Sequence, residues 1–430
     1  MKKIIYLLSA FYLSFVATAQ QTPAPIQSES ILIQGATLHI GDGTIIENGS
    51  LGLENGKIVE IGSSTSITNN YTTQIDATGQ HVYPGFIATN STVGMVEIDA
   101  IRPTNDLNEI GTFLPNIRTI IAYNAESKVV ESLRPNGILT AQIVPTRGRI
   151  AGSSTVVQLD AWNWEDAAIK TDEGMHIYWP RSYRRGNPTK GEDPLLYDQK
   201  NYDKQVLELD AYLKEAKTFT TATDKKHLPH AALQASFNGK QQVYLHAKEK
   251  RQILDGIVFL QKHGLNNIVL VGGDDAHLIL PFLKKNDIPV IVSRPHRLPN
   301  TADEDVKLPF KMAKLLMDAG LIITIDVSGR MERMNTRNLP FYAGTFAAYG
   351  VDKEKAVQMI TLNAAKILSV EDKLGSLTVG KDATLFIAIG DALDMRTNQL
   401  SHAFIQGRAI LLETHQTELW KRYMEKFSRK

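Results

Sequence analysis

The chain has 430 residues, of which 43% are hydrophobic and 22% charged, and this composition excludes wholesale disorder. Its 47 basic and 46 acidic side chains give a formal net charge of +1, which argues against nucleic acid or an anionic membrane surface as the main partner. The absence of cysteine excludes disulfide bonds, thiolate catalysis and zinc sites built from cysteine.

The first 19 residues have the pattern of a secretory signal peptide. Lys2 and Lys3 precede an apolar run at residues 4–16, and Ala-Thr-Ala at 17–19 is a small-x-small cleavage site. The alternative is a membrane anchor, but spanning a bilayer takes roughly 20 apolar residues. We therefore expect cleavage before Gln20, a periplasmic or secreted protein, and no membrane span in the rest of the chain.

Residues 31–83 alternate in the manner of short antiparallel strands. Apolar side chains stand two apart at Ile31 and Ile33, and two alternating runs flank Asn55 and Gly56. Asn-Gly in that setting is the strongest short hairpin signal, because both turn positions need a positive φ. We expect a small antiparallel sheet, not a parallel one.

The spacing of the apolar residues changes near residue 242. Short apolar runs begin at Val243, Ile268, Ile288 and Leu321, and amphipathic helical patterns lie between them. Strand–helix–strand units of this length build parallel sheets, so the centre of the chain is predicted to be α/β.

Earlier parts of the chain are less regular. Candidate strands lie at residues 81–87, 138–144 and 155–159. Residues 172–201 are rich in Gly, Pro, Tyr and Arg without a clear period, and we interpret them as a long loop insertion.

The alternating, turn-rich pattern typical of antiparallel strands returns after Leu368. Short alternating runs and tight turns at both chain ends predict one sheet domain made of residues 31–83 and 366–411, beside a central domain of residues 84–365. A single core stops growing beyond roughly 250–300 residues, so more than one unit is expected for this length. Residues 412–430 form a charged tail with a weak helical period.

Four short motifs follow one another along the chain. They read Asn-Gly-Lys-Ile at 55–58, Pro-Gly-Phe-Ile at 84–87, Thr-Leu-Asn-Ala-Ala at 361–365, and Leu-Gly-Ser-Leu followed by Gly-Lys-Asp-Ala-Thr-Leu within 374–385. In this order they resemble the amidohydrolase superfamily, particularly its imidazolonepropionase-like and dihydroorotase-like branches. The resemblance implies a (β/α)8 barrel of the TIM type, residues 84–365, beside a β-sandwich assembled from both chain ends. It also implies one or two divalent metals at the C-terminal ends of the barrel strands.

The same resemblance identifies four site positions. In the family the first barrel strand supplies His-x-His, but Asn90 and Thr92 stand there, and their neutral oxygens hold zinc weakly. His246 falls where the fifth strand carries a metal-binding histidine; alternatively it is a histidine bonded to a neighbour. Asp326 falls where the eighth strand carries the catalytic acid that also binds metal. The family pattern therefore implies a degenerate metal site.

A third protein ligand would have to come from another side chain. Glu97 and Glu109 follow the first strand, Glu165 follows a later one, and His277 lies after the sixth strand, where a helix-start role is the alternative. An oxygen-rich site would favour Mn²⁺ or Mg²⁺ over Zn²⁺. We expect one divalent metal, which could be Zn²⁺, Mn²⁺ or Mg²⁺, or none.

Two segments carry side chains suited to a substrate pocket. Trp162, Trp164 and Glu165 follow a predicted strand and could wall and orient a ligand, or alternatively anchor a loop. Arg147 and Arg149 could hold an anionic group, or alternatively lie in a solvated turn.

Three hypotheses for the function follow. The first is an exported hydrolase of non-peptide C–N bonds, acting on a cyclic amide or N-acyl small molecule, with Asp326 as general base. The second is a catalytically inactive homologue that serves as a binding or structural partner of an intact amidohydrolase paralogue. The third is a carbohydrate-binding barrel that uses Trp162 and Trp164. The chain could form a homo-oligomer, or a hetero-oligomer with such a paralogue.

Overall fold

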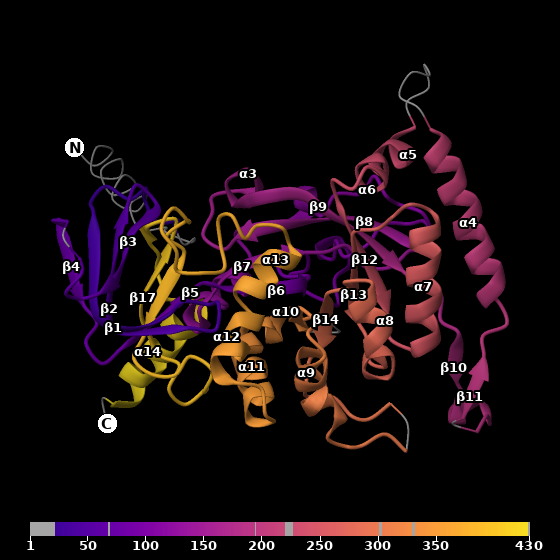
Figure 1. Cartoon of the computed structure of the whole chain (residues 1–430). Helices are drawn as coiled ribbons and strands as arrows, with labels where there is room; N and C mark the ends of the chain where they lie inside the picture. Colours follow the sequence, from indigo (N-terminus) through magenta and orange to yellow (C-terminus); the bar gives the residue numbers. More distant parts are fainter. Residues whose placement is uncertain are drawn as a thin grey trace.

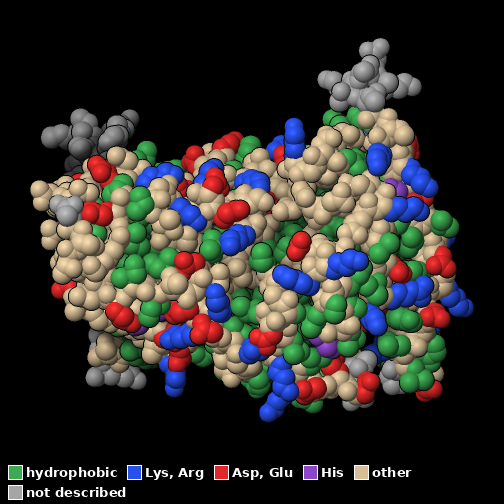
Figure 2. All heavy atoms as spheres, in the orientation of Figure 1, with side chains coloured by type: hydrophobic (Ala, Val, Ile, Leu, Met, Phe, Trp, Pro, Cys, Tyr) green, Lys and Arg blue, Asp and Glu red, His purple; other side chains and the backbone are tan. Residues whose placement is uncertain are grey.

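The structure of the chain is a computed structural model (Figure 1). It describes residues 22–67, 69–193, 195–219, 227–300, 303–328 and 332–428. The predicted signal peptide lies outside the described residues. Among those described, no helix combines the length and the apolar character that a bilayer span requires. Charged side chains of both signs are interspersed over the face shown in Figure 2, in keeping with the even charge balance.

Eight strands close a barrel in the centre of the molecule, and helices lie outside it. This confirms the predicted barrel of the TIM type. The strands are nearly all buried, as expected for a sheet covered by helices. In barrel order they are β6 (Phe86–Ser91), β7 (Ile138–Ile143), β8 (Ile150–Gln158), β9 (Ala168–Tyr178), β12 (Gln242–Ala247), β13 (Ile268–Gly272), β14 (Val290–Ser293) and β15 (Ile323–Asp326).

Strand β8 runs in the opposite direction to its neighbours. It pairs antiparallel with β7 and with β9, whereas the other barrel pairs are parallel. Only residues 144–149 join β7 to β8, and a parallel connection needs a crossover of a dozen or more residues. The C-terminal end of β8 therefore lies at the end of the barrel where the other strands begin.

Strand β9 corrects the predicted loop insertion at residues 172–201. Residues 172–178 belong to this barrel strand, and the short hairpin β10 (Tyr183–Arg185) and β11 (Leu196–Asp198) follows it. The sequence pattern does not indicate this strand, because Glu173 and His176 are polar although they are buried inside the protein.

The outer helices have the predicted amphipathic pattern. In α7 (Lys250–Lys262) the buried residues Ile253, Ile257 and Leu260 share one face, and Gly264 follows with a φ of +85°. The other helices are α2 (Lys128–Glu131), α3 (Trp164–Ala167), α4 (Tyr202–Thr218), α5 (Leu228–Ala232), α6 (Gln234–Phe237), α8 (Leu280–Lys285), α9 (Leu308–Asp318), α10 (Glu332–Asn335), α11 (Leu339–Ala348), α12 (Lys353–Met359), α13 (Leu362–Ile367) and α14 (His415–Ser428).

Helix α13 closes the end of the barrel where the parallel strands begin. It contacts β6 and β15, and the Asn363 side chain donates a hydrogen bond to the Ile323 carbonyl. Its residues Ala364 and Ile367 belong to an apolar cluster with Ile87, Tyr244 and other barrel residues. The opposite end of the barrel is therefore the one at which a site can open.

The two chain ends form one further sheet, as predicted from the alternating runs. Its order is β18-β17-β16-β5-β1-β2-β3, with β4 also pairing with β1. The Asn-Gly hairpin is confirmed, since Asn55 and Gly56 have φ values of 50° and 78°. The wholly antiparallel expectation is wrong, because β1 pairs parallel with β4 and β5. The strands are β1 (Ile31–His39), β2 (Ile45–Glu54), β3 (Lys57–Ser63), β4 (Thr73–Asp76), β5 (His81–Pro84), β16 (Leu385–Ala388), β17 (Leu400–Ile405) and β18 (Arg408–Ala409).

A buried carboxylate joins this sheet to the barrel. Asp160 follows β8 and is 5% exposed. Its oxygens lie 2.6 Å from Arg134 Nη1 and 2.9 Å from Arg408 Nη1, and the backbone N–H of Ala24 donates to it at 2.9 Å. Three distant parts of the sequence thus meet at one side chain.

Candidate functional site

The candidate site lies where the parallel barrel strands end. Asp326 is the last residue of β15 and pairs in register with Thr89 and Ser293, while His246 in β12 pairs with Tyr178. Parallel strands direct their C-terminal ends to the same side, so Asn90, His246 and Asp326 belong to one end of the barrel, called the mouth here.

Asn90 and Asp326 contact each other directly at the mouth. The Asn90 side-chain Nδ2 donates to Asp326 Oδ1 at 2.9 Å, and the Ser328 backbone N–H donates to the same oxygen at 2.7 Å. Burial raises the pKa of Asp326, and these hydrogen bonds offset part of that rise. Asn90 has a φ of +53°, which asparagine tolerates, and its Oδ1 is buried without a hydrogen-bond partner among the described residues.

His246 is bonded to a second histidine that the sequence analysis missed. His246 Nε2 lies 2.8 Å from His176 Nδ1, and the Tyr178 ring stacks on His246 with centroids 3.9 Å apart. Burial lowers the pKa of His246 to about 3 and that of His176 well below its usual value, so both rings are neutral at pH 7. One ring therefore donates the shared hydrogen to the other.

A buried polar network runs from the barrel interior toward the mouth. The Glu173 carboxylate accepts hydrogen bonds from the Tyr244 hydroxyl, from the Ser154 hydroxyl at 2.7 Å and from Gln142 Nε2 at 2.9 Å. Gln142 Oε1 in turn accepts from the Asn90 backbone N–H at 2.9 Å. Burial raises the pKa of Glu173 despite these three donors.

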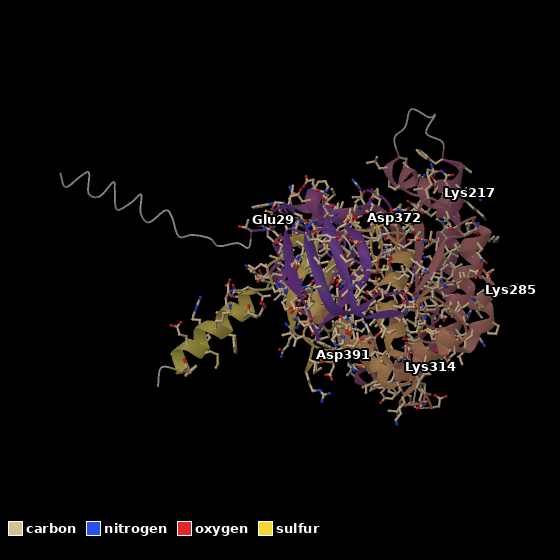
Figure 3. All side chains as sticks on the ribbon, turned by 60° about the vertical axis from the view of Figure 1, so that its left-hand side comes forward. Glu29, Lys217, Lys285, Lys314, Asp372 and Asp391 are labelled. Atoms are coloured by element: carbon tan, nitrogen blue, oxygen red, sulfur yellow. The ribbon has the colours of Figure 1, made fainter. Side chains whose placement is uncertain are left out.

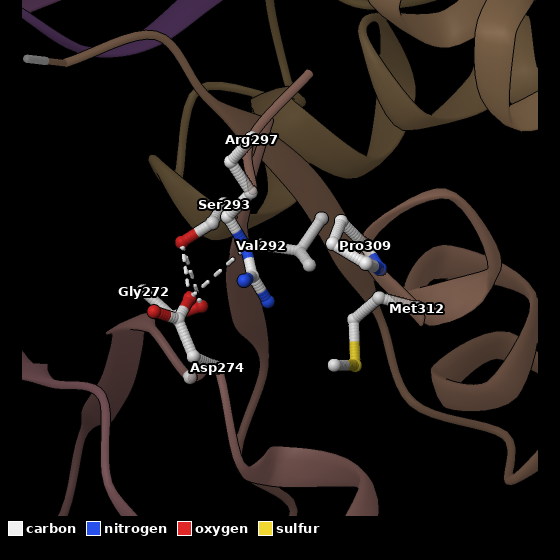
Figure 4. A pocket seen from close by; sticks show the side chains of 8 residues that line it. Gly272, Asp274, Val292, Ser293, Arg297, Pro309 and Met312 are labelled. Atoms are coloured by element: carbon white, nitrogen blue, oxygen red, sulfur yellow. Dashed lines mark hydrogen bonds and ion pairs between the residues drawn. The ribbon is translucent and has the colours of Figure 1, made fainter. Parts of the chain in front are cut away.

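A shallow depression lies beside the mouth (Figure 4). Asp274 follows β13 and accepts a hydrogen bond from the Ser293 hydroxyl at 2.7 Å, with Arg297 Nε 3.9 Å away. Pro309 and Met312 from α9 form its apolar side. Because Ser293 pairs with Asp326, this depression adjoins the mouth and adds a second carboxylate to it.

The side chains of the mouth do not fit a catalytic metal. Among the residues that the structure describes, no three His, Asp or Glu side chains are grouped closely enough to hold an ion. His246 and His176 each use a ring nitrogen on the other, and Asp326 Oδ1 is engaged by Asn90. A catalytic zinc takes three protein ligands, so His246 and Asp326 alone do not suffice.

The other ligand candidates are placed away from this pair or bonded elsewhere. Thr92 lies just beyond β6 and is 7% exposed. Glu97 Oε1 accepts from Asn124 at 3.1 Å, and Glu109 is exposed. His277 lies in a 3-10 helix after β13, in agreement with its alternative as a helix-start residue.

The tryptophan segment lies at the opposite end of the barrel. Because β8 is reversed, Trp162, Trp164 and Glu165 follow its end at the side closed by α13. Asn163 caps α3 by accepting from the Asp166 N–H, and Trp162 is 61% exposed. The structure therefore does not bring this segment together with Asp326.

The two candidate arginines lie at the mouth side, in the connection between β7 and β8. Arg149, the residue before β8, donates to the Tyr178 carbonyl of β9 at 2.6 Å and to Gln205 Oε1 of α4 at 2.7 Å. Its guanidinium group is therefore engaged within the fold. Arg147 is exposed, with a φ of +66°. Arg147 therefore has the more accessible charge of the two.

Known proteins resemble the chain in both sequence and structure. Residues 215–410 match the model of the amidohydrolase family. The chain is 23% identical over 390 residues to 5'-deoxyadenosine deaminase of Methanosarcina barkeri, covering 84% of this chain and 82% of that protein. It is 24% identical over 382 residues to imidazolonepropionase of Streptococcus pyogenes, covering 81% and 85%. A solved amidohydrolase from Thermotoga maritima superposes with a TM-score of 0.73 at 22% identity, over 89% of this chain and 99% of that one.

Proposed function

Since the chain belongs to the amidohydrolase superfamily of hydrolases that act on carbon–nitrogen bonds, we propose that it is an exported hydrolase whose metal site is degenerate. Its substrates would be small cyclic amides or N-acyl compounds. The observation that carries the proposal is the carboxylate of Asp326, which ends a barrel strand at the open side of the barrel and has a raised pKa. A carboxyl whose pKa is raised by burial is suited to general acid–base work.

The proposed reaction uses Asp326 twice. Its carboxylate takes a proton from the attacking water as the water oxygen bonds to the carbonyl carbon, and it passes that proton to the nitrogen as the C–N bond breaks. Asn90 holds the carboxylate in place through its side-chain amide. A divalent metal, where a superfamily member holds one, activates the water; the residues at this mouth do not fit it, and no step proposed here depends on one.

Replacing Asp326 with asparagine should reduce turnover at least about 100-fold, because the base is removed. The assay is hydrolysis of a panel of cyclic amides and N-acyl amino acids by the chain that begins at Gln20. Asp318→Asn, at the exposed end of α9, is the matched control and should retain full turnover. Undiminished turnover in Asp326→Asn, with an unchanged circular dichroism spectrum, would remove Asp326 from the mechanism.

A second candidate function is favoured because the described residues contain no group of three side chains that could hold a metal ion. If no metal binds and no substrate turns over, the chain would be a binding or structural partner of an intact amidohydrolase paralogue. The activity panel separates the two proposals. Turnover by the purified protein supports the hydrolase, while no turnover, with a paralogue co-purified from the source cells, supports the partner.

Export is a separate part of the proposal. The native protein should begin at or near Gln20, which N-terminal sequencing of protein from the periplasm or medium will test. Replacing Leu8 and Leu13 in the apolar run with arginine should retain the chain inside the cell, because the run no longer forms a signal core. A native protein that still begins with Met1 would contradict export.

A further inference from the structure

The last helix of the chain, α14, stands away from the body of the protein (yellow in Figure 3). None of its residues from His415 to Ser428 is buried. Four large apolar side chains are exposed to an unusual degree along it: Trp420 62%, Tyr423 55%, Met424 51% and Phe427 60%. Side chains of this kind are normally covered, so the helix presents a surface that its own chain does not use.

The four side chains form one continuous stripe. They stand at positions i, i+3, i+4 and i+7, which share a face of an α-helix. We call this face the aromatic stripe. Lys421 and Lys426 lie on the two flanks of the stripe, and the Lys426 ammonium lies 5.6 Å from the Phe427 ring centroid. The acidic side chains Glu418 and Glu425 point to the opposite side of the helix by the same periodicity.

The charge of this segment departs from that of the whole chain. From residue 415 to the last residue of the sequence there are five basic and two acidic side chains, whereas the complete chain is nearly neutral. A basic helix with Trp, Tyr and Phe on one face and lysines at its flanks is the pattern of a helix that lies in a membrane surface. Trp and Tyr favour the boundary between headgroups and acyl chains, and lysine stems reach from there to anionic headgroups.

We propose that α14 docks on an anionic phospholipid surface, with the aromatic stripe inserted at the headgroup boundary. The helix lies on the bilayer and does not span it. Because α14 stands apart from the barrel and the terminal sheet, it can reach a surface without either of them unfolding. The membrane would then hold the mature protein by one short segment, independently of whether the mouth is catalytic.

A second copy of the chain is a poorer occupant for the stripe. The helix has 14 residues and is therefore about 21 Å long. One face of a helix of that length offers far less than the roughly 800 Å² per partner that a stable protein interface buries. A lipid surface needs no such area, because the headgroups also attract the basic flanks.

The test is flotation of the chain that begins at Gln20, which contains every described residue, with two kinds of vesicle. One kind is phosphatidylcholine alone, and the other contains about 30% phosphatidylglycerol to supply the anionic surface potential. The stripe variant is Trp420→Gln combined with Phe427→Gln. Trp162→Gln is the matched control, because Trp162 is 61% exposed on a different part of the surface.

We expect the unaltered chain and the Trp162→Gln control to float with the anionic vesicles, and more weakly with the neutral ones. The affinity of the stripe variant for the vesicles should be at least about tenfold lower, since two large apolar side chains no longer leave water on binding. Raising the salt concentration should also weaken binding, because the basic flanks are screened. Equal binding by the stripe variant, or no binding by any form, would overturn the proposal. A doubled mass in sedimentation that is lost only in the stripe variant would instead assign the stripe to a second copy.

Discussion

Replacing Asp160 with alanine is expected to lower the free energy of unfolding by about 3–5 kcal/mol, the range found when one partner of a buried ion pair is removed. Asp160 is the carboxylate that contacts both Arg134 and Arg408, whose side chains are 6% and 12% exposed. In the alanine variant, two poorly hydrated guanidinium groups would lose this carboxylate, and the Ala24 N–H would lose its hydrogen-bond acceptor. Urea unfolding followed by circular dichroism measures the loss.

The matched control for Asp160 is an exposed ion pair. Asp318 pairs with Lys314 in α9, and their side chains are 59% and 42% exposed. Asp318→Ala should cost no more than about 1 kcal/mol, because water screens such a pair. Equal losses in the two variants would show that the contact between sheet and barrel does not depend on the buried carboxylate.

Replacing Glu173 with alanine should also be strongly destabilising, by about 3 kcal/mol or more, because buried donors lose their acceptor. The donors are the Tyr244 hydroxyl, the Ser154 hydroxyl and Gln142 Nε2. Glu173→Gln should cost much less, since it keeps the shape and one acceptor oxygen, and its amide can donate to the Tyr244 oxygen. If the two variants are equally unstable in urea, the carboxylate itself is indispensable.

The same residue should make stability depend on pH. Because burial raises the pKa of Glu173, the native state holds this proton more tightly than the unfolded chain does. Its contribution to stability is therefore complete below the ordinary glutamate value of 4.5 and is lost as pH rises through the raised pKa. Asp326 acts in the same direction. Glu173→Gln cannot ionise, so it should lose less stability than the unaltered chain between pH 4.5 and neutrality, measured by urea unfolding at each pH.

Much of the fold could be predicted because its signals are local. The runs at β12, β13, β14 and β15 are almost wholly apolar, and the Asn55–Gly56 turn requires backbone angles that few other residue pairs adopt. The direction of β8 depends instead on how a short connection pairs it with two neighbours. No residue type in residues 150–158 indicates that direction, so Trp162 and Trp164 could not be assigned to the closed end from the sequence.

The candidate site was predictable only in part. Asp326 could be located because it ends a recognisable apolar strand, and His246 because its segment resembles the fifth barrel strand of the family. His176 and Glu173 could not, since both are buried polar residues in a strand without a clear alternation, and their partners come from β7, β8 and β12. Buried polar pairs depend on which strands become neighbours, and that information is not local.

The reversed strand β8 has a consequence for how this protein can be re-engineered. In a barrel whose strands are all parallel, every connection after a strand reaches the mouth, so a graft at any of them can alter ligand choice. Here the segment after β8, residues 159–167, leads to Asp160 and the terminal sheet. Exchanging that segment would change how the two parts of the fold are attached, while exchanging residues 144–149 would change what the mouth admits. Directed evolution of substrate range should therefore diversify the second segment and leave the first untouched.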